Sequence, residues 1–115
     1  MKERSHGDYL EDIYDAVEDI ASFVNGMSKS TFLRDKKTIN AVIRSLEVMG
    51  EASKKTPSRI KKRHPSIPWK KMEGMRNKMI HEYFGVDIEI LWKTAKENVP
   101  LLKPLIEGLL KEIYG

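Results

Sequence analysis

The chain has 115 residues, a formal net charge of +4 and no cysteine. A chain of this length is expected to form one domain with one core, and the lack of cysteine excludes disulfides, thiolate metal sites and cysteine nucleophiles. No apolar run approaches the length of a membrane span, and the polar first residues do not resemble a signal peptide. We therefore expect a single domain over residues 1–115, located in the cytoplasm and without contact to a membrane.

Apolar residues recur at helical spacing from Leu10 to Val24, and acidic residues fall largely on the opposite face. Asp8 is a suitable N-cap for this first helix, and Asn25-Gly26 should end it. The pattern predicts an amphipathic helix with an acidic outer face.

A short loop is predicted over residues 27–31, followed by a second helix that begins between residues 32 and 35 and ends near residue 54. Pro57 should stop this helix, and residues 58–62 are expected to form one helical turn. Residues 63–68 contain two prolines, which disfavour helix just before them, so this stretch is predicted to be a loop.

A third helix should begin at residue 66 or 67 with Pro68 near its first turn. It should fray around residues 81–84, with Gly85 as its C-cap. Trp69, Met72, Met75, Met79 and Ile80 form its apolar stripe, and a methionine-rich stripe adapts to imperfect packing or to a partner.

Asp87 is predicted to cap a fourth helix that carries Ile88, Ile90, Leu91, Trp92 and Ala95 on its apolar positions. Residues 98–100, which end in a proline, should break it, and a fifth helix should begin at Pro100 or Pro104. No segment alternates like a strand. The sequence therefore predicts an all-α protein, an up-and-down bundle of about five helices.

Positive charge is concentrated in one quarter of the chain. Residues 54–78 carry a net charge of +9, whereas residues 1–53 carry −3 and residues 79–115 carry −2. Clustered positive charge attracts polyanions such as RNA. For such a run alone a solvated Lys/Arg face is the simpler explanation, but its position beside the candidate site favours binding of a polyanion. The candidate RNA-binding residues are Lys61, Lys62, Arg63, Lys70, Lys71 and Lys78.

This basic segment leads directly into Arg76, Asn77, His81 and Tyr83. An arginine can hold a phosphate in bidentate geometry, and a histidine can transfer protons near neutral pH. We interpret Arg76 and His81 as a catalytic pair for phosphodiester chemistry on RNA, with no metal and no cofactor. Asn77 lies four residues before His81, so it could support the imidazole by a hydrogen bond.

The spacing sets a geometric problem, because residues five apart on an ideal helix differ by about 140° around its axis. Either the helix ends near Ile80, which frees His81 to turn, or a second copy of the chain supplies the partner residue. The motif is also short enough to occur by chance, with Arg76 as a surface ion-pair partner and His81 as an ordinary helix-end residue.

The segment from Arg76 to Tyr83 resembles the R-x4-H-x-Y signature of the HepT-type toxins, a branch of the HEPN superfamily. Residues 41–52, 67–72 and 81–87 are also similar to that family. The resemblance covers the chain from about residue 8 to residue 112, which makes it far more specific than the motif alone.

The resemblance implies a helical bundle that forms a homodimer and acts as a metal-independent endoribonuclease, the toxin of a toxin–antitoxin pair. Its partner would be an MntA-type minimal nucleotidyltransferase antitoxin, which can attach AMP to the motif tyrosine. By this resemblance Arg76 and His81 are catalytic, Asn77 supports them, and Tyr83 is modified. Glu51 is a weaker candidate for a carboxylate that orients the site.

Two other functions fit the sequence. The chain could be a non-catalytic subunit that binds a nucleotide or a nucleotidyltransferase, in which case the motif holds a phosphate without cutting. It could also be a plain nucleic-acid-binding domain that uses residues 54–78, and its binding would then depend strongly on salt.

Overall fold

A computed structural model describes residues 5–81 and 87–115, without the side chains of residues 76–81. Every regular element within these ranges is helical, so the predicted all-α class is confirmed. None of the described helices is long and apolar enough to cross a bilayer. The elements are α1 (His6–Val24), α2 (Lys29–Leu33), α3 (Lys36–Lys55), α4 (Ser58–Arg63), α5 (Trp69–His81), α6 (Ile88–Lys93), the π-helical turn η2 (Thr94–Asn98), the 3₁₀ turn η3 (Val99–Leu101) and α7 (Leu102–Tyr114).

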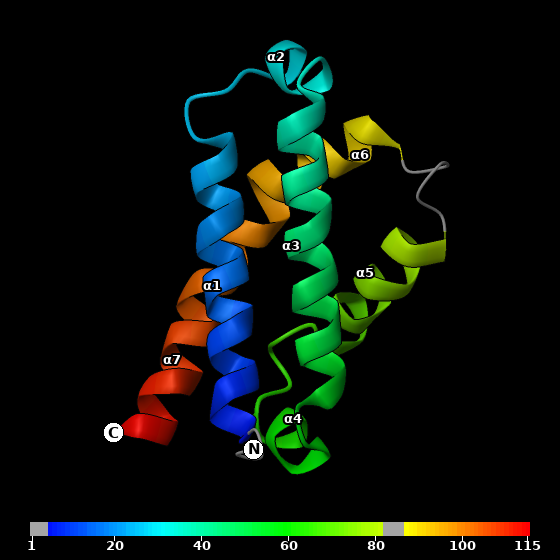
Figure 1. The fold of residues 1–115 in the computed structure, drawn as a ribbon. Coiled ribbons are helices and arrows are strands. Elements are labelled where there is room, and N and C mark those ends of the chain that lie inside the picture. Colours follow the sequence, from blue (N-terminus) through cyan, green and yellow to red (C-terminus); the bar gives the residue numbers. More distant parts are fainter. Residues whose placement is uncertain (1–4, 82–86) are drawn as a thin grey trace.

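The two longest helices, α1 and α3, lie side by side and run in opposite directions (Figure 1). Helix α5 packs against α3, and α7 packs against α1. The short helices α2 and α4 lie at opposite ends of α3 (Figure 1). The core between these helices consists of aliphatic side chains with a few methionines and aromatics, and its most deeply buried members include Leu10, Ile13, Ile20, Phe32, Leu46, Met49, Met72, Leu91 and Ile106.

Helix α1 begins earlier than predicted. The backbone N–H of Ser5 donates to Asp8 Oδ2 at 2.9 Å, and Ser5 Oγ accepts from the backbone N–H of Asp8 at 3.4 Å. This reciprocal pair is a capping box with Ser5 as the N-cap, so the prediction of Asp8 as N-cap was wrong by three residues. The predicted end is confirmed, since Asn25 is the C-cap and Gly26 follows with a positive φ of 74°.

The loop predicted over residues 27–31 was wrong in part, because α2 begins at Lys29. Ser28 caps this short helix, and its side chain accepts from the backbone N–H of Thr31 at 3.2 Å. The predicted start of the second helix is confirmed. Asp35 caps α3 by accepting from the backbone N–H of Thr38 at 3.0 Å, and α4 is the turn expected after Pro57.

The predicted break at residues 98–100 was wrong, because the chain passes from α6 through η2 and η3 into α7 without leaving helical conformations. Pro100 is accommodated in the first turn of η3, where a backbone N–H is not needed. Ile88 and Ile90, two of the apolar residues of the predicted fourth helix, are 37% and 53% exposed. The predicted cap Asp87 is confirmed, while the predicted C-cap Gly85 lies outside the described residues.

A polar cluster joins α1 to α7. Lys103 Nζ lies 2.8 Å from Glu18 Oε1, and the Tyr14 hydroxyl donates to Glu107 Oε2 at 3.4 Å. The hydrogen bond and charge of Lys103 lower the pKa of the Glu18 carboxyl, and Glu18 in turn raises the pKa of Lys103. The ion pair therefore favours the charged form of both groups in the folded state.

This pair should make stability depend on pH. A carboxyl whose pKa is lowered by folding stabilises the fold above its unfolded pKa, and that contribution is lost as the pH falls through the folded pKa. We expect Glu18→Gln to lower the free energy of unfolding near neutral pH and to leave it almost unchanged once the pH is below the lowered pKa that Glu18 has in the folded state. Urea unfolding of both proteins at several pH values measures this difference. Glu89→Gln, which removes the exposed pair with Lys29, is the control and should have little effect.

Candidate functional site

Helix α5 carries the motif and is anchored firmly at its start. Trp69 and Met72 are buried in the core, and the indole N–H of Trp69 donates to the carbonyl of His64 at 3.0 Å. The described part of α5 ends at His81, one residue after Ile80, near which the sequence allowed the helix to end. Arg76, Asn77 and His81 therefore share one helix, and the backbone positions of Arg76 and His81 differ by about 140° around its axis.

The side chains of Arg76, Asn77, Lys78 and His81 are not described, and Tyr83 lies outside the described residues. The catalytic, supporting and modification roles assigned to these residues stay predictions. What the structure adds is the common support of these residues, because α5 packs against α3 and buries Trp69 and Met72 in the core.

Some of the candidate basic residues near α5 form ion pairs with acidic side chains, and others form none. Lys61 Nζ lies 3.2 Å from Glu73 Oε2, which joins α4 to α5. Arg63 donates to Glu112 Oε1 at 2.6 Å, and His64 Nε2 lies 3.3 Å from the other oxygen of Glu112. These side chains tie α4 and the following loop to the rest of the fold.

Among the described side chains, three other candidate cations are available to bind a ligand. Lys62, Lys70 and Lys71 are exposed, and within the described part of the chain they take part in no ion pair or side-chain hydrogen bond. Lys70 and Lys71 lie in the first turn of α5, and Lys62 lies in α4 just before it. Three candidate RNA-binding cations without an ion pair therefore lie in and just before the first turn of the motif helix.

Glu51 lies in α3, the helix against which α5 packs. Its side chain is partly exposed and pairs with Lys55 Nζ at 3.4 Å, one turn further along the same helix. Its suggested role in orienting the site stays a prediction.

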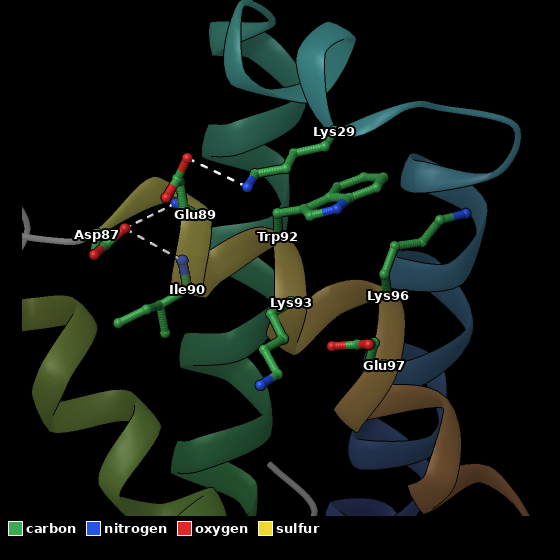
Figure 2. A pocket seen from close by; sticks show the side chains of 8 residues that line it. All are labelled: Lys29, Asp87, Glu89, Ile90, Trp92, Lys93, Lys96 and Glu97. Carbon is green, nitrogen blue, oxygen red and sulfur yellow. Dashed lines mark hydrogen bonds and ion pairs between the residues drawn. The ribbon is translucent and has the colours of Figure 1, made fainter.

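A separate hollow of about 550 Å³ lies beyond the far end of α5, between α2, α6 and η2 (Figure 2). Its charged side chains balance, with Lys29, Lys93 and Lys96 against Asp87, Glu89 and Glu97. Lys29 pairs with Glu89 at 3.3 Å, and Lys96 Nζ lies 5.5 Å from the centre of the Trp92 ring. This hollow was not predicted from the sequence, and its balanced charge does not favour a polyanion.

Comparison with known proteins identifies the family of this chain. Residues 13–109 match the family described as "Ribonuclease HepT-like". The chain belongs to the HepT-like ribonuclease family. A member from Thermococcus cleftensis, named "Probable ribonuclease HepT", is 56% identical over 108 residues, which cover 94% of this chain and 98% of the relative.

A further relative covers the chain just as fully. A protein of Methanocaldococcus jannaschii named "Putative RNase MJ1216" is 43% identical over 115 residues, which cover 100% of this chain and 95% of the relative. No solved structure matches the chain at a significant level. The resemblance inferred from the motif is thus confirmed at the level of the family.

Proposed function

We propose that this chain is a metal-independent endoribonuclease and the toxin of a toxin–antitoxin pair. The single observation that carries the proposal is the position of the R-x4-H motif on a well-anchored helix of a HepT-like fold, with unpaired lysines at its start. The relatives add support, because proteins named as ribonucleases match this chain over nearly their whole length.

The chemistry follows from the residue types. One histidine, His81, takes the proton from a ribose 2′-hydroxyl, and the freed oxygen attacks the adjacent phosphorus. Arg76 stabilises the extra negative charge on the phosphoryl oxygens. The bond from phosphorus to the 5′-oxygen then breaks, and a second histidine protonates this leaving oxygen. The products are a cyclic phosphate and a 5′-hydroxyl end.

This scheme needs a second copy of the chain. Because α5 continues through His81, positions 76 and 81 face directions about 140° apart on one helix. A homodimer solves the problem when the motif helices of two copies meet across a twofold axis, so that each site takes residues from both. The dimer also supplies the second histidine that the leaving oxygen requires.

The experiment that tests the proposal is RNA cleavage by the purified protein in excess EDTA. Cleavage in EDTA supports a metal-independent ribonuclease, and end-group analysis should find the cyclic phosphate. Saturable nucleotide binding without any cleavage would replace this proposal by the nucleotide-binding alternative.

The unpaired lysines should bind the RNA backbone. We expect the triple variant Lys62→Gln/Lys70→Gln/Lys71→Gln to bind RNA more weakly and to lower the slope of log K against log salt by about 2, since each lost contact to single strands removes about 0.7. Binding titrations at several salt concentrations measure this slope. The matched control Arg34→Gln/Lys36→Gln/Lys37→Gln removes three charges near the opposite end of α3. An equal change of slope in both variants would show that only net charge matters.

The proposed antitoxin is an MntA-type minimal nucleotidyltransferase that attaches AMP to Tyr83. A bulky anionic group two residues from His81 would block the site and compete for the charge of Arg76. We expect Tyr83→Phe to remain active but to resist AMPylation by such an enzyme, as measured by a mass shift of one AMP. Modification of Tyr83→Phe to the wild-type level would place the acceptor elsewhere.

A further inference from the structure

A groove of about 350 Å³ lies between α1 and α3, and none of its lining residues belongs to the motif helix α5. Its two walls are formed by residues three or four apart on each helix, which places them on one face of that helix. The lining residues are Asp12, Asp15, Ala16, Asp19 and Phe23 of α1, and Ala41, Arg44, Ser45 and Val48 of α3.

The floor of this groove is built from small or medium-sized side chains, all of them apolar except Ser45. Ala16 and Ser45 are buried, and Ala41 and Val48 are half-buried. Small residues let another helix approach closely, and Phe23 stands at one end of the groove with 39% of its surface exposed. From Asp12 to Phe23 the groove follows twelve residues of α1, which rise by about 16 Å along the helix axis, and this length fits three turns of a docked helix.

The rim of the groove is acidic although the chain as a whole carries +4. Asp15 and Asp19 are exposed and take part in no ion pair within the described part of the chain. Arg44 is the positively charged residue among those that line the groove. Its Nη1 lies 3.5 Å from Oε2 of Glu47 on the same helix. The rim therefore repels RNA and attracts a cationic partner.

A second copy of this chain is a poor occupant for the same reason. Twofold packing of two such grooves would oppose the aspartates of both copies, and only Arg44 from each would offset them. Like charges brought together across an interface cost several kcal/mol, so the charge pattern selects a different protein.

We propose that the groove between α1 and α3 docks an amphipathic helix of another protein, whose apolar stripe is flanked by lysines or arginines. The stripe covers Phe23 and the small residues of the floor, and the flanking cations pair with Asp15 and Asp19. The site is independent of the ribonuclease proposal, because neither the groove nor its charges include a residue assigned to RNA cleavage.

The test uses two designed peptides of about 18 residues, long enough for a stable amphipathic helix. Both carry leucines at every third or fourth position, flanked by lysines in one peptide and by glutamates in the other. We expect the lysine peptide to bind the full chain saturably and the glutamate peptide not to bind. Asp15→Asn/Asp19→Asn should weaken binding of the lysine peptide by about tenfold and leave RNA cleavage unchanged.

The matched control is Glu89→Gln/Glu97→Gln, which removes two negative charges from the hollow near α6. It should bind the lysine peptide as the wild type does. Amide NMR shifts should report the contact at α1 and α3. No saturable binding, equal binding of both peptides, equal weakening by both double variants, or shifts confined to other helices would each overturn the proposal.

Discussion

Replacing His81 by alanine should reduce RNA cleavage in excess EDTA by at least about 100-fold, because general acid–base catalysis by one histidine contributes about that much or more. Arg76→Ala should have a comparable effect, since it removes the group that stabilises the phosphoryl charge. Initial rates on an end-labelled RNA measure both losses, and the helical content of each variant is checked by circular dichroism.

His64→Gln is the matched control for this prediction. His64 precedes α5 and pairs with Glu112, so it belongs to the fold and is assigned no part in the chemistry. This variant should cleave RNA at the wild-type rate. Equal cleavage by His81→Ala and the wild type would exclude the catalytic assignment and favour the plain RNA-binding alternative.

Mixing the two inactive variants tests the need for two copies. If each site takes its arginine from one copy and the histidine that acts as base from the other, a mixed dimer of Arg76→Ala and His81→Ala keeps one such pair, although it lacks the second histidine that protonates the leaving oxygen. Mixing should then restore a small part of the wild-type activity. No recovery, despite exchange of subunits, would mean that both histidines are required or that each copy supplies both residues to its own site.

The helices were largely predictable because hydrophobic periodicity is a local property, and it placed the ends of α3 and the cap Asp87 correctly. The errors occurred where a cap or a turn competes with the local pattern. Ser5 was missed because the reciprocal bond with Asp8 makes Asp8 the third residue of the helix rather than its cap. Pro100 indicated a break, yet the structure accommodates it in a 3₁₀ turn.

The chemical motif could be recognised from the sequence because its residues are close neighbours along the chain. The separation of the basic residues into paired and unpaired groups could not be predicted, since it depends on contacts between distant segments. Arg63 is bound by Glu112, which lies 49 residues further along the chain. The groove between α1 and α3 could not be predicted for the same reason, because the residues of each wall alone form one face of an ordinary amphipathic helix.

Replacing Phe32 by alanine should destabilise the protein by about 3–5 kcal/mol, the usual cost of removing a fully buried phenylalanine. Phe32 is the buried residue of the short helix α2 and is 0% exposed. Its ring centre lies 5.2 Å from that of Trp92 in α6. Urea unfolding of Phe32→Ala should show a lower midpoint with an unchanged slope. Phe32→Leu should lower the free energy of unfolding by less, because it leaves a smaller cavity.

Phe23→Ala is the matched control, since Phe23 lies near the end of α1 but is 39% exposed. It should change the free energy of unfolding by less than about 1 kcal/mol, because its side chain lies in the α1–α3 groove rather than in the core. The loss in Phe32→Ala is large against a typical total stability of about 5–15 kcal/mol. Cleavage by that variant should therefore fall on warming in step with the unfolded fraction. Equal destabilisation by both substitutions would mean that α2 does not anchor α6 through Phe32.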